Sequence, residues 1–194
     1  CAWAQELKYE DGVYSKVFQT EKSNEEVYQS AREWIAINFK SANDVLQLDT
    51  KEKLIVKGSM GFKLLTYSFV DDYICEMMLS VSIRDKRFKI DIEPREAYSV
   101  EFPNRSNSLI NYQFMVLGQI SEREALDNRI EEWEKKAKSE GYKQKKIDKI
   151  SKTIIATNPE VHKRALTNLY NFNLGVSSTI NSLGEYVNSE EKKG

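Results

Sequence analysis

The sequence predicts an α+β protein: an antiparallel sheet covered by a helix, followed by a C-terminal helical region of about three helices. Two observations predict this class. Between residues 9 and 117 apolar side chains mostly alternate with polar ones, the period of a half-buried strand. Between 121 and 187 they recur every three or four residues, as on a helix. We therefore expect an α+β domain over 9–118 and a helical region over 119–194 packed on it.

A strand and a helix open the first region. Residues 13–20 predict the strand, and residues 24–39 predict the helix. Ser23 and Glu26 form a capping box, in which the serine hydroxyl accepts from the Glu26 amide and the Glu26 side chain reaches back. Helical spacing then links Val27, Ala31, Trp34 and Ile35. We expect Trp34 to be the core anchor of this helix.

Further strands are predicted over 45–48, 53–58, 62–70 and 73–83. Asp71 and Asp72 are expected to form the turn after the third of these. The polar run 84–87 then leads into alternating residues 88–93, which is the clearest hairpin in the chain. Pro94 is expected to end that hairpin, and residues 97–102 to add an edge strand. Residues 104–108 are expected to be a loop.

Cys75 lies in the run 73–83, in which every odd-numbered residue is apolar or aromatic. It is therefore expected to be a buried core thiol. A disulfide to Cys1 is not expected, because it needs Cys1 to be retained, unlipidated and close by.

Three helices are predicted in the second region. Ser121 and Glu124 form another capping box, Trp133 anchors the apolar stripe, and Gly141 supplies the stop. A second stripe covers 147–154, and Pro159 is expected to break it and open a third helix. That last helix has no charged residue from 165 to 184. It either packs on the sheet domain or forms an oligomer or partner surface, where charged residues are depleted.

Composition excludes several classes of protein. The chain has 194 residues, and Lys+Arg 29 against Asp+Glu 30 leaves a net charge of −1, which argues against a general nucleic-acid binder. One histidine and two cysteines exclude most zinc sites and any disulfide-dense scaffold. The aromatic content, eight Phe, ten Tyr and three Trp, is enough to build a core.

The first residues predict export to the periplasm or cell envelope. The chain starts at Cys1 without a methionine. Cys1 is either the lipid-bearing first residue of a processed lipoprotein, or Ala2-Trp3-Ala4 is the tail of a signal peptide. A trimmed cytosolic chain is the remaining interpretation. The uncharged segment 165–184 has the length of a membrane span but is too polar for a bilayer core, so attachment would be through a lipid on Cys1.

A family resemblance covers roughly residues 13–100. It rests on Val17-Phe18, the segment 23–28, Ala31 to Trp34, Phe39, and the strands 45–49 and 55–58 with Gly58, together with the hairpin 83–88. These residues resemble the opening of an uncharacterised family of exported bacterial proteins, described as a domain of unknown function with a TBP-like (TATA-binding-protein-like) fold. The resemblance implies a sheet with helices on one face. It implies no catalytic residue and nothing about DNA.

The sequence contains no recognised catalytic motif, and we expect no catalytic residue, no cofactor and no metal. The single histidine, His162, lies beside Lys163 and Arg164 and is expected to be a surface helix residue. Adjacent carboxylates occur at 25–26, 71–72 and 131–132. On a helix such neighbours do not face each other, so a catalytic pair would have to come from distant residues.

A basic cluster is predicted near the start of the second apolar stripe. It consists of Lys143, Lys145, Lys146, Lys149 and Lys152. Two interpretations stay open: contact with an anionic surface or acidic partner, or the solvated face of a helix whose other side is apolar.

The sequence therefore predicts a non-enzymatic envelope protein that binds or scaffolds an envelope protein or ligand. Its contact surface would be the open sheet face or the uncharged last helix. The alternatives are an envelope hydrolase that uses a carboxylate pair, and an assembly protein whose last helix drives homo-oligomers. Nucleic acid is not an expected partner.

Overall fold

A single six-stranded antiparallel sheet organises the chain. The computed structural model describes residues 6–39, 45–65, 70–101 and 122–189. In chain order the elements are β1 (Lys8–Glu10), β2 (Val13–Gln19), α1 (Asn24–Asn38), β3 (Leu46–Asp49), β4 (Lys53–Leu65), β5 (Val70–Arg84), β6 (Arg87–Ser99), α4 (Glu122–Ser139) and α5 (Gln144–Asn188). The strand order is β1-β2-β6-β5-β4-β3. This confirms the predicted α+β class.

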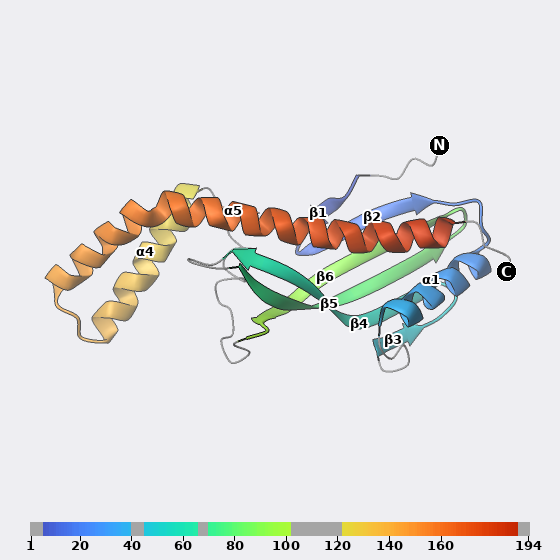
Figure 1. Cartoon of the computed structure of the whole chain (residues 1–194), viewed down its shortest axis with the longest axis horizontal. Helices are drawn as coiled ribbons and strands as arrows, with labels where there is room; N and C mark the ends of the chain where they lie inside the picture. Colours follow the sequence, from blue (N-terminus) through green and yellow to red (C-terminus); the bar gives the residue numbers. More distant parts are fainter. Residues whose placement is uncertain (1–5, 40–44, 66–69, 102–121, 190–194) are drawn as a thin grey trace.

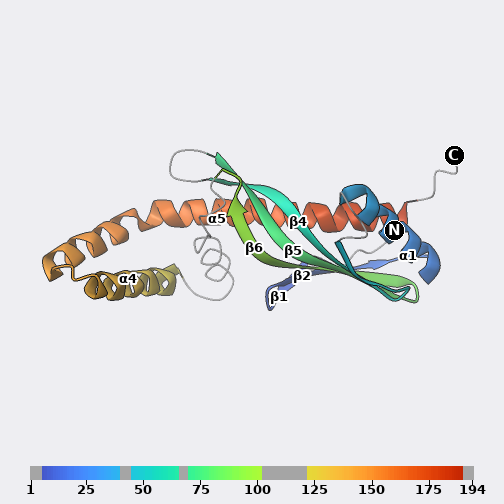
Figure 2. The same cartoon turned by 90° about the horizontal axis from the view of Figure 1, so that it is seen from below.

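Two helices lie on one face of the sheet. In Figure 1, α1 and the second half of α5 cross the same side of the strands. The first half of α5 pairs with α4 and forms a helical hairpin that extends beyond the end of the sheet (Figure 2). The chain therefore has a packed body and a projecting arm, and the continuous helix α5 runs through both.

The predicted first helix is confirmed together with its cap. The Glu26 amide donates to Ser23 Oγ at 3.3 Å, and the Ser23 amide donates to Glu26 Oε2 at 2.8 Å. These two bonds satisfy donors that the first turn leaves free. The buried side of the helix carries Trp34, whose Nε1 donates to Ser182 Oγ of α5 at 3.3 Å.

β4 is one long strand, which corrects the prediction of two. It runs without a break from Lys53 to Leu65 and pairs with β5 along its whole length. Asp71 and Asp72 therefore lie inside β5 rather than in a turn, opposite Leu64 and Lys63. The ladder offsets their poor strand propensity, and Lys63 pairs with Asp72 at 3.2 Å.

Pro94 does not end β6, and residues after it do not form a separate edge strand. Met77 pairs with Pro94, whereas Cys75 pairs with Ala97, so two residues of β6 oppose one of β5. Such a bulge accommodates a residue that has no amide hydrogen to donate. It also shifts the buried face, from Phe88, Ile90 and Ile92 before the bulge to Ala97 and Ser99 after it.

Residues 122–189 form two helices instead of the expected three. Gly141, at φ 78°, ends the first helical segment as predicted. Pro159, however, lies inside α5, which continues for 45 residues. An interior proline removes one hydrogen bond and costs about 3 kcal/mol, but packing on both sides of it keeps the helix continuous. In Figure 1, α5 changes direction between the arm and the sheet.

The second half of α5 belongs to the main hydrophobic core. Its apolar side fills the space between the strands and α1, and its buried residues are Phe172, Val176, Ile180, Leu183 and Val187. The strands contribute the alternate residues of β2, β4, β5 and β6. Of the two interpretations of the uncharged segment 165–184, packing on the sheet therefore accounts for its buried side.

Candidate binding face of the sheet

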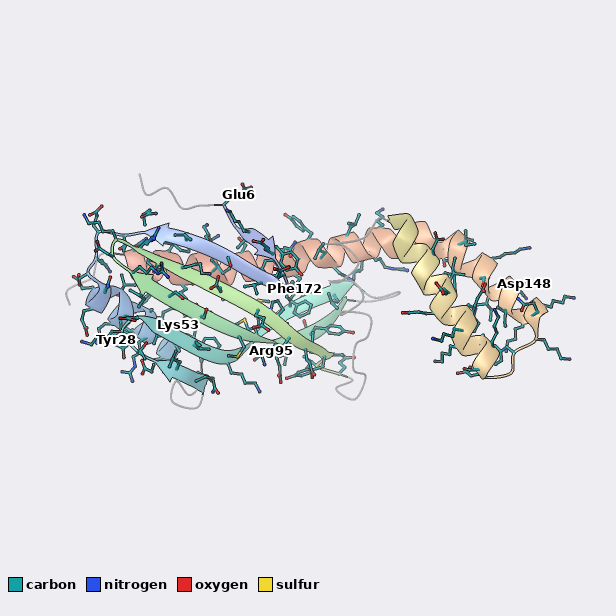
Figure 3. All side chains as sticks on the ribbon, turned by 180° about the vertical axis from the view of Figure 1, so that it is seen from behind. Glu6, Tyr28, Lys53, Arg95, Asp148 and Phe172 are labelled. Atoms are coloured by element: carbon teal, nitrogen blue, oxygen red, sulfur yellow. The ribbon has the colours of Figure 1, made fainter. Side chains whose placement is uncertain are left out.

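The face of the sheet opposite α1 and α5 is the candidate site. Figure 3, which is seen from behind the molecule, shows this face directly. The strands lie in front of α5, and no described helix crosses them. Side chains alternate between the two faces of a strand. Because Phe88 and Ile90 point into the core, their neighbours Arg87, Lys89 and Asp91 point to this open face.

A two-residue turn aligns basic residues at one end of the open face. β5 ends at Arg84 and β6 begins at Arg87, and these two arginines are paired directly opposite each other. The turn residue Lys86 has φ 57°, a left-handed conformation that tight turns often contain. The next row on the same face contains Val17, Lys89, Ser82 and Lys53. Four cationic side chains therefore occupy two adjacent rows.

A shallow depression lies between these side chains. It has a volume of about 360 Å³ and is lined by Val17, Ser82, Arg84, Arg87, Phe88 and Lys89. The Phe88 side chain points into the core and is 1% exposed, so Arg84, Arg87 and Lys89 supply the charged side chains of this depression. We call this group of residues the arginine end of the open face.

Among the described side chains, Asp91 is the acidic group that pairs with a residue of the arginine end. Its Oδ2 lies 2.9 Å from Lys89 Nζ, and its Oδ1 accepts from Ser15 Oγ at 2.5 Å. Ser80 Oγ is 3.5 Å from Oδ2. Lys89 is therefore partly neutralised, whereas Arg84 and Arg87 have no side-chain hydrogen bond or ion pair within the described part of the chain.

The rest of the open face mixes small, apolar and charged side chains. Ile55, Ile74 and Met78 are half-buried, and Lys57 and Ser59 are exposed. A face of this composition resembles an ordinary non-obligate protein interface more than a catalytic cleft.

Two of the sequence-predicted anchors lie under the opposite face. Trp34 is 5% exposed and Cys75 is 1% exposed, and both belong to the main core. Burial raises the pKa of the Cys75 thiol to about 11, so the group is protonated and unreactive at neutral pH. Cys1 lies outside the described residues.

The third anchor and the predicted lysine cluster lie on the projecting arm. Trp133 is half-buried there, with its ring 6.0 Å from that of Tyr142. Lys146 lies over the Tyr142 ring at 3.8 Å. Lys143, Lys145, Lys146, Lys149 and Lys152 are all exposed around the tip. Figure 3 places this tip, marked by Asp148, at the opposite end of the molecule from Lys53, which is paired with Ser82 of the arginine end.

The described side chains among the candidate catalytic residues lie in separate places and form local contacts or are exposed. Glu25 pairs with Lys51 at 2.6 Å, and Glu26 belongs to the α1 cap. Glu131 and Glu132 are exposed on α4. His162 lies within α5, but its side chain is outside the described residues.

Within the described ranges, no group of three His, Cys, Asp or Glu side chains could hold a metal ion. No helix in the described part of the chain is both long and apolar enough to span a bilayer.

The arginine end was missed by sequence reasoning, which treated 84–87 as a polar turn. One signal could have found it. A two-residue connection fixes the register of a hairpin, so the residues flanking it must face each other. Arginine on both sides of Asp85-Lys86 then places two like charges opposite each other.

Part of the chain matches the model of a known protein family. Residues 14–94 match the model of DUF4468, a domain of unknown function with a TBP-like fold. A DUF4468 family protein from Bacteroides ovatus is 17% identical, with a TM-score of 0.38 over 49% of this chain and 65% of that chain. A TBP-like protein from Parabacteroides distasonis is 12% identical, with a TM-score of 0.38 over 54% of this chain and 80% of that chain. No curated protein matches the chain.

Proposed function

We propose that the chain, whose residues 14–94 match the model of a domain of unknown function with a TBP-like fold, is a binding module whose contact surface is the open face of the sheet. The proposed partner is an envelope protein or ligand. The module performs no reaction in this proposal. It holds its partner against a rigid sheet.

The observation that carries the proposal is the one-sided packing of the sheet. α1 and α5 bury one face completely, with Leu54, Leu79 and Ile90 each 0% exposed. The opposite face carries exposed side chains on several strands and two arginines without a described counter-ion. A rigid scaffold that displays exposed polar and apolar groups is suited to recognition, because little conformational entropy is lost when a partner binds.

Two of the carboxylates of this face favour binding over hydrolysis. A hydrolase of the carboxylate type needs two acidic groups directed at one bond. Asp91 is instead occupied by Lys89 and Ser15, and Glu93 lies 3.9 Å from Arg95. Both groups are therefore used in local pairs.

Site-specific photo-cross-linking in the native host tests the contact surface. A photoreactive residue replaces Ser59 on the open face, and the matched control replaces Ser178 on the outer side of α5. Both serines are exposed. We expect a discrete adduct from position 59 and none from position 178. Adducts from position 178 alone, or from neither position, would contradict the proposal.

The envelope location is part of the proposal and is supported by the Ala2-Trp3-Ala4 pattern. Mass spectrometry of the protein from fractionated cells tests it. We expect it in the envelope fraction, either cleaved near Gln5 or carrying a lipid on Cys1. An unmodified protein in the cytosolic fraction would argue against export.

Homo-oligomeric assembly is a second candidate, favoured by one observation on α5. Leu166, Tyr170 and Leu174 follow at intervals of four and are 46%, 66% and 56% exposed. Such spacing places them on neighbouring turns of one side of the helix. Light scattering over a range of concentrations tests this candidate. A dimer that Tyr170→Ser dissociates would support assembly, and a monomer at all concentrations would rule it out.

A further inference from the structure

We infer that the arginine end of the open face binds a phosphoryl group. The depression between Arg84, Arg87 and Lys89 would hold the phosphate of a ligand whose remainder extends over the neighbouring sheet. This inference rests on the proposed function, because it assigns a ligand chemistry to part of the same contact surface.

The first argument is an uncompensated pair of like charges. Arg84 and Arg87 are direct cross-strand partners on the last rung of the β5–β6 ladder. Like charges at such positions destabilise a hairpin. Neither guanidinium has a described partner, although Lys89 in the adjacent row has Asp91 at 2.9 Å. An anion between the two arginines would remove the repulsion.

The second argument is the match of charge. Arg84, Arg87 and Lys89 together carry three positive charges, and Asp91 offsets one of them. A phosphate monoester carries about −1.5 to −2 at pH 7, close to the remaining charge of +2. A carboxylate would neutralise only half of it. The phosphoryl group is therefore the better match.

The third argument is the geometry of the donors. Guanidinium groups bind phosphate oxygens in pairs of parallel hydrogen bonds, whereas an ammonium acts as a point charge. Here both arginines and Lys89 line the same depression, together with the Ser82 side chain. Three cationic groups from two strands therefore border one depression, where a phosphate would meet all three.

The size of the depression implies a ligand larger than a free ion. Its volume of about 360 Å³ is at the lower end of the range for small-molecule sites. Val17 supplies apolar surface beside the basic rim. The ligand is either a soluble phosphate monoester or the headgroup of phosphatidic acid, and both present a terminal phosphomonoester.

Calorimetric titration of the full chain with inorganic phosphate and with glycerol 3-phosphate tests the site. Chloride at matched ionic strength is the reference, because non-specific attraction depends on salt alone. We expect saturable binding of both ligands, weakened about tenfold or more by Arg84→Gln and by Arg87→Gln. Arg95→Gln is the matched control, since it removes an exposed arginine from β6, the strand of Arg87. This variant should bind phosphate as the wild type does.

Thermal unfolding provides a second readout that does not depend on detectable heat. Phosphate should raise the melting temperature of the wild type and of Arg95→Gln more than that of either arginine variant. The variants should fold, because both side chains are exposed and each substitution relieves repulsion. An equal rise in melting temperature for the wild type and every variant, or no binding of phosphate at all, would overturn the inference.

Vesicle binding separates the two sources of the phosphate. Vesicles of phosphatidic acid in phosphatidylcholine are compared with phosphatidylcholine alone. Retention on the former that requires Arg84 and Arg87 identifies a lipid headgroup, whereas binding of glycerol 3-phosphate without retention identifies a soluble ester. Retention that is lost in Lys145→Gln/Lys149→Gln but kept in the arginine variants would overturn the inference and assign anion contact to the arm.

The two proposals can fail independently. A cross-link at position 59 without arginine-dependent phosphate binding would overturn the phosphoryl site alone. Arginine-dependent phosphate binding without that cross-link would keep the phosphoryl site and reject the wider partner surface.

Discussion

Asn168 of α5 holds the end of β4 by binding both backbone groups of Leu65. The Leu65 amide donates to Asn168 Oδ1 at 2.7 Å, and Asn168 Nδ2 donates to the Leu65 carbonyl at 3.1 Å. The side chain thus replaces the backbone of a neighbouring strand. Asn168 is only 4% exposed, so these bonds are shielded from water. The long helix is therefore fastened to the sheet where it leaves the core.

Asn168→Ala should lower the free energy of unfolding by about 1–3 kcal/mol, because it leaves two backbone groups without their partner. Urea unfolding followed by circular dichroism measures the change. Thr167→Ala is the control, since Thr167 is exposed and bonds only within its own helix. It should change stability by less than about 0.5 kcal/mol. Equal effects of the two substitutions would show that the amide does not anchor α5.

Two glycines of α5 should respond to alanine with opposite signs. A Cβ at Gly184 would collide with the Phe18 ring, which is buried and stacked on Phe88 at 5.2 Å. A Cβ at Gly175 would meet only Met60 Sδ, at an ordinary 3.6 Å. Gly184→Ala should therefore destabilise by about 1–3 kcal/mol. Gly175→Ala should stabilise by about 0.5–1 kcal/mol through helix propensity. Thermal unfolding of both variants measures this, and a stabilising Gly184→Ala would contradict the close packing of α5 on β2.

Alkaline pH should destabilise the protein through its buried thiol. Burial raises the pKa of Cys75 from 9.0 to about 11, so above pH 9 the thiol ionises in the unfolded chain but stays protonated in the folded one. Stability is complete below pH 9 and falls by about 1.4 kcal/mol per pH unit from pH 9 to about 11. Burial also raises the pKa of Tyr14, which adds a loss at still higher pH.

Cys75→Ala isolates the contribution of the thiol. Urea unfolding of both proteins across this pH range measures the difference in stability between wild type and variant. That difference should shrink as the pH rises above 9. A constant difference would mean that the thiol is not shielded as its burial indicates.

Two tryptophans differ in their hydrogen bonding, and Trp→Phe substitutions should reveal it. Trp133 Nε1 is buried and has no partner among the described residues, whereas Trp34 Nε1 donates to Ser182. Trp133→Phe removes an unsatisfied group and should cost less than about 1 kcal/mol or even stabilise. Trp34→Phe should cost about 1 kcal/mol more, because it loses a made bond. Urea unfolding measures the loss of stability in the two variants. A larger loss for Trp133→Phe than for Trp34→Phe would contradict this expectation.

Local signals predicted the elements that depend on neighbouring residues. The α1 cap needs only Ser23 and Glu26, and the β5–β6 hairpin needs only alternation on both sides of a short turn. β1 was missed although its signal was present, since Asp11-Gly12 is a typical hairpin turn and both residues have positive φ. These features are decided within a few residues, so sequence suffices for them.

The failures at proline have a different cause. Pro94 and Pro159 each weaken the element that contains them, and sequence alone therefore predicted a break. The β6 bulge opposite Glu76 and the core contacts of Phe172 and Val176 outweigh that local preference. The bulge and the core contacts both depend on residues far apart in the chain, which local propensity does not take into account.

The candidate site was only half predictable. The register that sets Arg84 against Arg87 follows from the hairpin turn. Which face those arginines occupy depends on where α5 packs, and that depends on contacts such as Tyr14 Oη to Asn173 Oδ1 at 2.6 Å, 159 residues apart. The sequence expectation that an open face would serve as the contact surface stays a proposal.

Nuclear magnetic resonance of the isotope-labelled chain tests the central claim most directly. Inorganic phosphate is titrated into the full chain, and the change in each backbone amide signal is mapped on the fold. The account predicts saturable changes centred on Val17, Ser82, Arg84, Arg87 and Lys89, with none at the arm. Changes confined to residues 143–152, or no saturable change anywhere, would contradict it.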